Sequence, residues 1–153
     1  MTDIDPVFAD AQQFSVQLKR LRMDSGFAIE ILDSALRRID HRDQALLLLS
    51  CLGTDVTVGM LDSLLRVGLN SRDALQVRHL IGRLSYAQAV TLVPPAVDRL
   101  LEIEADGESF RRMAELLDHL GTRAALDKLC SLAYDSADAD VREVASDFSR
   151  NVY

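Results

Sequence analysis

Apolar residues recur at helical spacing in four segments of the chain. In each segment, one apolar residue is followed by others three, four and seven positions later, which places them on one face of an α-helix. The segments begin at Ala45, Val77, Phe110 and Val141, so successive starts are 32, 33 and 31 residues apart. All sixteen positions are apolar, namely 45, 48, 49, 52, 77, 80, 81, 84, 110, 113, 114, 117, 141, 144, 145 and 148. The pattern predicts one helix repeated four times.

A second helical motif precedes each of these segments and carries an Asp in its second position. The four copies are "LDSAL" from Leu32, "LDSLL" from Leu61, "VDRLL" from Val97 and "LDKLC" from Leu126. The chain is therefore predicted to form four helical hairpins, each with an A helix and then a B helix. The expected pairs are 25–39 with 42–52, 54–68 with 72–84, 86–104 with 107–120, and 122–135 with 138–150. A short hairpin cannot bury its apolar face alone, so neighbouring hairpins should stack.

Residues with capping preferences agree with these boundaries. Ser85 and Gln88 have the spacing of a capping box at a helix start. Gly53 and Gly121 each follow a terminal Leu and suit the left-handed end of a helix. The pair Asp5-Pro6 is typical of a first helical turn and predicts an additional helix over about 6–23. We expect that helix to cover the first hairpin.

The last hairpin, "LDKLCSLAYDSADADVREVASDFSR", resembles a HEAT repeat, in which a helix and an acidic turn precede Val-Arg on the second helix. Val77-Arg78 and Phe110-Arg111 are similar, whereas Ala45-Leu46 departs from the pattern. This resemblance to the HEAT-repeat, or armadillo-type α-solenoid, family covers about 25–150. It implies an all-α fold, a right-handed α-α superhelix (a HEAT-like solenoid) of four hairpins. Residues 1–24 would be the N-terminal cap helix and 25–153 the repeat domain, as one domain overall.

The resemblance also implies a structural ladder between neighbouring repeats. An Asp series and an Arg series occupy equivalent positions of the repeats, and in this family such residues often pair. The Asp series is Asp33, Asp62, Asp98 and Asp127, and the Arg series is Arg78, Arg111 and Arg142.

Two segments leave alternatives open. Pro94-Pro95 falls inside the third A helix, and an interior Pro removes a helical hydrogen bond. We expect a kink there, and the alternative is two helices split at Val93. The segment 45–52, "ALLLLSCL", is apolar almost all round. We expect the cap helix to bury its outer side, and the alternative is an exposed docking patch.

Charge is concentrated at one end of the chain. The net charge is −7; residues 1–97 carry eleven acids and ten bases, and residues 98–153 carry thirteen acids and seven bases. Duplex DNA and anionic membranes are therefore poor candidate partners, whereas a basic protein would be attracted. We expect a cytoplasmic protein because the sequence has no membrane-length apolar run, no signal-peptide pattern and only two isolated cysteines.

The residues that could carry chemistry do not form a known site. The three His are about forty residues apart and have no metal-ligand spacing. "EIEADGE", from Glu102, resembles the start of a Ca²⁺ loop, but Met113 stands where such a loop requires Glu. We therefore expect no metal, no cofactor and no enzymatic activity.

In HEAT-like stacks the B helices line one face, and some B-helix positions on that face are not used in packing. They are apolar at Leu47 and Cys51, then basic, then mixed and acidic. The predicted partner-binding residues are His79, Arg83, Arg112, Glu115, His119, Glu143, Asp147 and Arg150. We expect a non-catalytic protein–protein interaction module, a scaffold or adaptor, that binds a protein or peptide, including one with a basic region.

Three alternatives stay open. The B-helix face could be an ordinary solvated surface. The chain could instead be an acidic immunity protein that neutralises a basic toxin. An alternative of another class is a HEAT-like nucleic-acid base-processing enzyme, which needs a basic groove with aromatic side chains. A small basic patch could form from Arg78, Arg83, Arg111 and Arg112, with Tyr86 as the one candidate aromatic.

Overall fold

The computed structural model describes residues 5–149, and these residues form ten helices and no strand. The all-α prediction is confirmed for this part of the chain. The chain divides into two compact units, Met1–Met60 and Leu61–Tyr153. We describe each unit by itself.

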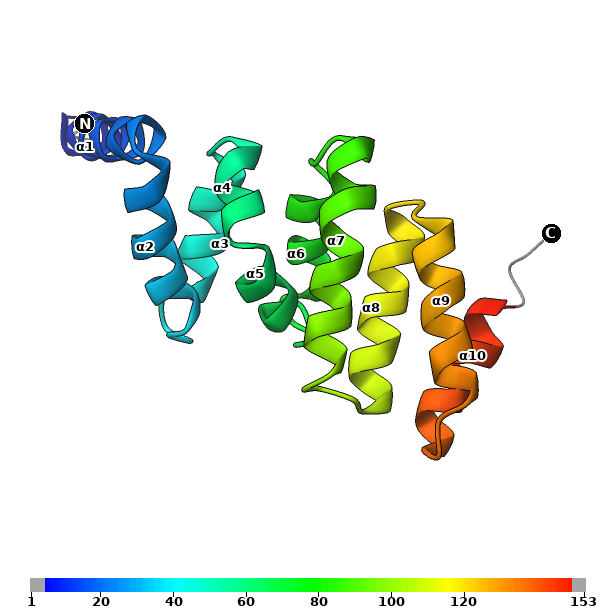
Figure 1. Cartoon of the computed structure of the whole chain (residues 1–153). Coiled ribbons are helices and arrows are strands. Elements are labelled where there is room, and N and C mark those ends of the chain that lie inside the picture. Colours follow the sequence, from blue (N-terminus) through cyan, green and yellow to red (C-terminus); the bar gives the residue numbers. More distant parts are fainter. Residues whose placement is uncertain (1–4, 150–153) are drawn as a thin grey trace. The chain divides into compact units, whose positions relative to one another are not determined.

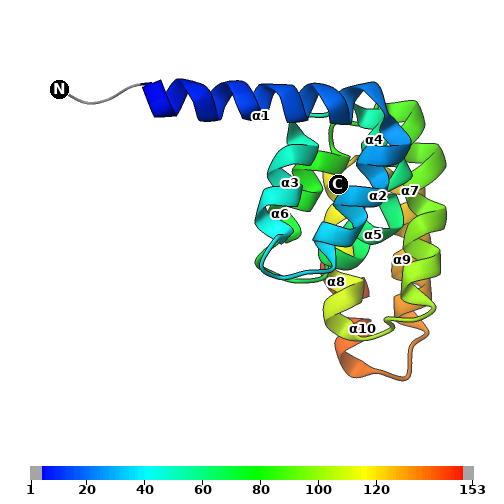
Figure 2. The same ribbon diagram turned by 90° about the vertical axis from the view of Figure 1, so that its left-hand side faces the viewer.

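The first unit contains four helices (Figure 1). They are α1 (Asp5–Met23), α2 (Ser25–Leu36), α3 (Arg42–Ser50) and α4 (Thr54–Gly59). Helices α2 and α3 pack against each other, and Leu32 and Leu36 of α2 and Leu46 and Leu49 of α3 are buried. Figure 2 shows α1 lengthwise, with its N-terminal half extending beyond α2 and α3. The predicted helix over 6–23 is present, but among its described side chains only Leu21 is buried.

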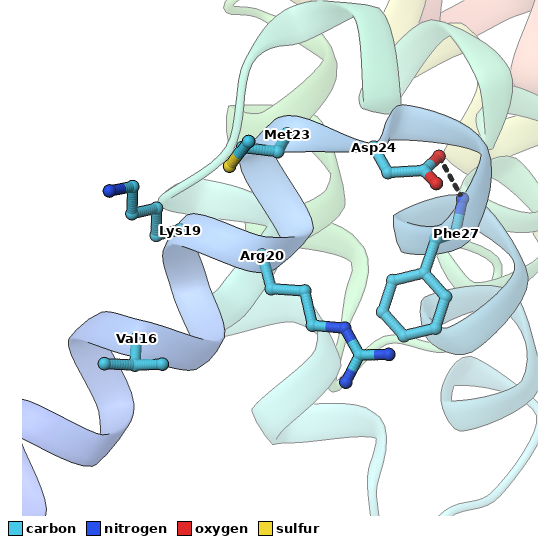
Figure 3. A pocket seen from close by; sticks show the side chains of 6 residues that line it. All are labelled: Val16, Lys19, Arg20, Met23, Asp24 and Phe27. Carbon is cyan, nitrogen blue, oxygen red and sulfur yellow. Dashed lines mark hydrogen bonds between the residues drawn. The ribbon is translucent and has the colours of Figure 1, made fainter.

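Polar contacts fix the direction in which α1 leaves α2. The carboxylate of Asp24 accepts a hydrogen bond from the Phe27 N–H at 3.0 Å and caps α2. The guanidinium of Arg20 lies 4.6 Å from the centroid of the Phe27 ring, in cation–π geometry (Figure 3). Arg22 donates to the Cys51 carbonyl through Nη2 at 2.9 Å. The C-terminal end of α1 is thus tied to the rest of its unit.

The second unit contains three hairpins, which lie side by side in chain order (Figure 1). They pair α5 (Leu61–Val67) with α6 (Ala74–Ile81), α7 (Tyr86–Leu101) with α8 (Gly107–His119), and α9 (Arg123–Tyr134) with α10 (Ala139–Ser149). The first helix of each is an A helix and the second a B helix. The B helices pack in succession, α6 against α8 and α8 against α10. Of the repeat positions in this unit, Phe110 and Phe148 are half-buried and the others are buried.

The helix predicted over 54–68 is two helices. The helix α4 ends at Gly59, α5 begins at Leu61, and the two compact units divide at the same place. Gly59 lies directly against the side chain of Ile29 in α2, where an added Cβ would clash. Gly at this contact allows the close approach but is a poor helix former, which accounts for the break.

The two prolines do not split α7. The helix runs without interruption from Tyr86 to Leu101 and contains both Pro94 and Pro95, so the alternative of two helices divided at Val93 is wrong. The prolines remove the donors for the carbonyls of Val90 and Thr91. Both residues are exposed, so water can satisfy these carbonyls.

The capping predictions were right at two positions and wrong at one. Ser85 and Gln88 form the capping box of α7. Gly121 has a φ of 68° and ends its helix in the left-handed region. Gly53, in contrast, has an extended backbone with φ −70° and is the residue before α4. It starts the next helix and does not end the previous one.

Candidate functional site

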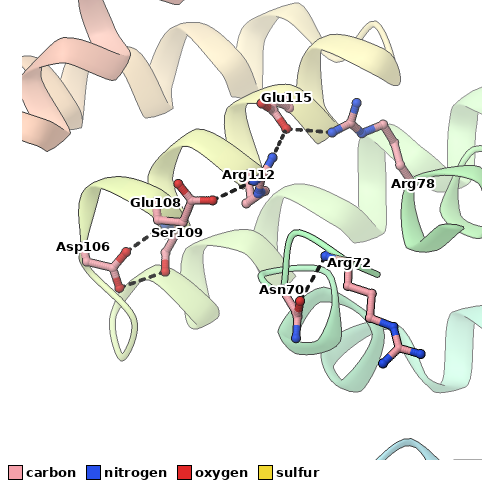
Figure 4. A network of polar contacts seen from close by, with 8 residues as sticks. All are labelled: Asn70, Arg72, Arg78, Asp106, Glu108, Ser109, Arg112 and Glu115. Atoms are coloured by element: carbon pink, nitrogen blue, oxygen red, sulfur yellow. Dashed lines mark hydrogen bonds and ion pairs between the residues drawn. The ribbon is translucent and has the colours of Figure 1, made fainter. Parts of the chain in front are cut away.

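Ion pairs connect successive B helices of the second unit. Arg78 of α6 reaches Glu115 of α8, with Nη2 and Oε2 2.7 Å apart (Figure 4). Arg111 of α8 reaches Asp147 of α10, with Nη1 and Oδ2 2.9 Å apart. Both arginines stand one position after the first apolar residue of their repeat. We call these two pairs the B row.

The aspartates of the repeats form a separate row on the A helices. Asp62 pairs with Arg99 at 2.8 Å, and Asp98 pairs with Lys128 at 2.6 Å. These pairs connect α5 to α7 and α7 to α9, and we call them the A row. The B row and the A row correct the ladder predicted between the Asp series and the Arg series. Equivalent faces of successive A helices lie near each other, as do those of successive B helices, so each series finds partners within its own layer.

Arg142, the last residue of the Arg series, and Asp33, the first residue of the Asp series, make local contacts. Arg142 donates to the carbonyls of Ser136 and Ala137, each at 2.8 Å, and so closes the turn before its own helix. Asp33 lies in the first unit and pairs with Arg37, the residue just after the end of α2. Neither of these contacts links neighbouring hairpins.

A charged network on α8 joins the B row. Arg112 contacts Glu108 through Nη2 at 2.7 Å and Glu115 through Nη1 at 3.1 Å (Figure 4). Glu115 thereby accepts from both Arg112 and Arg78. Glu108–Arg112–Glu115–Arg78 is a chain of alternating charges that spans two helices. The side chain of Arg112 is only 21% exposed and contacts two carboxylates.

Two histidines lie beside this network. His79 of α6 and His119 of α8 are exposed, and their ring centroids are 6.4 Å apart. His119 also lies close to Gly82, just after α6, where an added Cβ would be 3.2 Å from Nε2 of His119. Arg83 follows and is also exposed. The structure therefore brings together His79 and His119, two of the residues predicted to bind a partner.

Two of the remaining predicted binding residues lie on α10. Glu143 and Asp147 are exposed on this helix, and Asp147 is engaged by Arg111. Arg150 lies outside the described residues. Sequence reasoning gave Glu108 no place in the site, although its position four residues before Arg112 is the spacing of a helical ion pair.

An apolar hollow lies in the first unit between α1 and α3. Phe14, Leu18 and Leu21 of α1 line it together with Leu47 and Leu48 of α3, and its volume is about 500 Å³. Leu47 is 58% exposed. The expectation that the cap helix buries the outer side of 45–52 is therefore wrong at Leu47, because α1 lies beside α3 without covering that side chain.

The two cysteines are free thiols, Cys51 half-buried and Cys130 buried. Burial raises the pKa of the Cys130 thiol. Within residues 5–149 no three His, Cys, Asp or Glu side chains cluster closely enough to hold a metal ion. None of the helices in that range combines the length and apolar character needed to cross a bilayer.

Comparison with protein-family models, with curated proteins and with solved structures finds no match to this chain.

Proposed function

We propose that this chain is a non-catalytic protein-binding module whose contact surface is the B-helix face of the second unit. We further propose that its hairpins belong to a HEAT-like, right-handed solenoid and that it acts in the cytoplasm as a scaffold or adaptor. The observation that carries the proposal is the charged network on α6 and α8, with two exposed imidazoles beside it.

This network supports binding because its side chains are already ordered. Arg112 and Glu115 are held by contacts with Glu108 and Arg78, so a partner would not have to immobilise them. Ordering flexible side chains at an interface costs about 0.5–1.5 kcal/mol each. The exposed face crosses successive repeats, so one extended polypeptide could touch His79 and His119 together. Arg, moreover, is enriched at binding hot spots.

The charge distribution favours a partner with a basic region. The carboxylates of Asp135, Asp138 and Glu143 are exposed around α9 and α10. Such a concentration of acids would steer a basic partner and raise its association rate. An acidic immunity protein that neutralises a basic toxin is the alternative to a scaffold or adaptor.

The arginines of the predicted basic patch argue against a nucleic-acid enzyme. Arg78, Arg111 and Arg112 each contact a carboxylate, so much of their charge is neutralised within the chain. A single-strand groove needs basic side chains directed to the phosphates and aromatic side chains for stacking.

The proposal is tested by affinity capture from the native host. We compare the wild type with the double variant His79→Ala/His119→Ala and with Arg83→Glu. His41→Ala is the matched control, because His41 is an exposed histidine in the first unit. A partner that the wild type and the control retain should bind at least tenfold more weakly to both test variants, measured by calorimetry after purification. Equal affinity of all four proteins contradicts the proposed surface.

Arg112→Glu is unsuitable as the main test of binding. A carboxylate at this position would lie among Glu108 and Glu115, so the variant would disturb the fold and the surface together. The charge reversal at Arg83 acts at an exposed position, and a thermal melt of this variant separates loss of recognition from loss of the fold.

A further inference from the structure

One face of α1 carries an apolar stripe with the spacing of a coiled-coil seam. Val7, Ala11, Phe14, Leu18 and Leu21 follow one another at intervals of four, three, four and three residues. This is the a/d pattern of a heptad repeat, which normally packs against another helix. Only the C-terminal end of the stripe is covered within the unit, since Leu21 is buried, whereas Phe14 is 48% exposed and Val7 more so.

The uncovered part of the stripe and the hollow beside α3 lie next to each other. Phe14 belongs to both, and the hollow continues along Leu18, Leu47 and Leu48. Figure 2 shows that the N-terminal half of α1 extends past α3. The unit thus has a protruding apolar helix end and, beside it, an apolar hollow of about 500 Å³. A two-fold interface is self-complementary, and because the protrusion and the hollow lie side by side, each of two copies can place its protrusion in the hollow of the other.

The charges of α1 favour one orientation for such a pairing. Asp10 stands in its N-terminal half, and Lys19, Arg20 and Arg22 stand in its C-terminal half. In an antiparallel pair, Asp10 of each copy lies toward the basic half of the other copy. The two helix dipoles are also antiparallel, which is favourable. Two parallel copies would place acids beside acids and bases beside bases.

We propose that two copies of this chain associate through antiparallel α1 helices. The protruding half of each α1 seats its stripe in the hollow between α1 and α3 of the other copy. The two-fold axis passes near Phe14, so Val7 of one copy faces the C-terminal end of the stripe in the other. Because a single pair of helices forms a small interface, the association is reversible and depends on concentration.

Sedimentation velocity over a wide concentration range tests the association. The wild type should shift from monomer to dimer as its concentration rises. Phe14→Asp should be monomeric at every concentration, because the axis brings the two introduced carboxylates together in an apolar contact. Val7→Asp, at a more exposed position, should have the same effect. Unchanged helical circular dichroism shows that both variants are folded.

Val16→Asp is the matched control. Val16 lies on the same helix and is 61% exposed, but it is outside the stripe. This variant adds the same charge and should dimerise as the wild type does. A wild type that stays monomeric at all concentrations overturns the proposal. So does a dimer that Phe14→Asp leaves intact, or one that Val16→Asp disrupts equally.

The orientation is tested at Gln17. An axis near Phe14 brings Gln17 of one copy to the level of Asp10 of the other, and both residues are exposed. Gln17→Lys should therefore tighten the dimer several-fold, and Gln17→Glu should weaken it by a similar factor. In a parallel pair, Gln17 would face the basic half of its partner, and the two effects would change sign. That reversed result overturns the antiparallel arrangement.

Discussion

The second unit contains two rows of ion pairs that look alike in sequence but differ in their surroundings. Asp62–Arg99 in the A row and Arg78–Glu115 in the B row each join residues 37 positions apart, at 2.8 and 2.7 Å respectively. The side chains of Arg99 and Asp62 are 58% and 68% exposed, whereas those of Arg78 and Glu115 are 23% and 27% exposed. Equal distances therefore do not imply equal contributions to stability.

The partners of each pair explain the difference. Glu115 is shared by Arg78 and Arg112, and Arg112 also contacts Glu108. Removal of one member leaves a partly buried charge with fewer partners. Exposed pairs lose little when broken because water solvates both ions, and such pairs typically contribute about 0–1 kcal/mol. The B row should therefore matter more to stability than the A row.

The largest loss of stability is expected for substitutions in the buried layer beneath the B row. Ala114 of α8 and Ile81 of α6 are fully buried. Ala114→Asp and Ile81→Asp should each cost several kcal/mol and unfold the protein, because a buried carboxylate has no partner there. Glu143→Ala, at an exposed position, should cost no more than about 1 kcal/mol. Thermal melts of the three variants measure this order, and wild-type melting of either Asp variant would contradict the packing.

A double-mutant cycle compares the two rows directly. Arg78→Ala and Glu115→Ala, alone and together, should give a coupling energy of about 1–2 kcal/mol. The same cycle at Arg99 and Asp62 should give less than about 0.5 kcal/mol. Urea unfolding supplies the free energies. Equal coupling in the two rows would show that burial does not distinguish them.

Sequence periodicity predicted the core of these repeats well, because burial follows directly from the spacing of apolar residues. It could not predict which charged residues would meet. The Asp and Arg series are both periodic, and only the packing of A helices with A helices and B helices with B helices decides their partners. The break at Gly59 was also hidden, since it depends on the approach of Ile29 from another helix. Similarly, the exposure of Leu47 depends on how far α1 reaches along α3.

A smaller loss of stability is expected when the N-cap of α8 is removed. This helix carries most of the charged network. The N–H of Ser109 donates to the carboxylate of Asp106 at 2.9 Å, and this bond holds the pKa of Asp106 below its ordinary value. Asp106→Ala should cost about 1 kcal/mol near neutral pH, while Asp106→Asn should cost less because its amide oxygen still caps the helix.

The pH dependence of the unfolding free energy distinguishes Asp106→Ala from the wild type. The charged carboxylate is favoured in the folded state, so its contribution is present above the unfolded pKa and is lost as pH falls through the folded pKa. Unfolding free energies measured from neutral to acidic pH should show the difference between wild type and Asp106→Ala shrinking in acid. A difference that stays constant with pH would mean that the charge of Asp106 plays no part in the cap.

The smallest change in stability is expected for substitution of Lys128, the last residue of the A row. Its Nζ lies 2.6 Å from Oδ2 of Asp98, and both side chains are well exposed. Lys128→Met keeps the aliphatic stem and removes only the charge, so it isolates the ion pair from packing. We expect a change below about 0.5 kcal/mol, and less at high salt because exposed charges are screened. Urea unfolding at low and high salt measures both values. A loss above about 1 kcal/mol at low salt would show that the exposed row holds neighbouring hairpins together as strongly as the half-buried one.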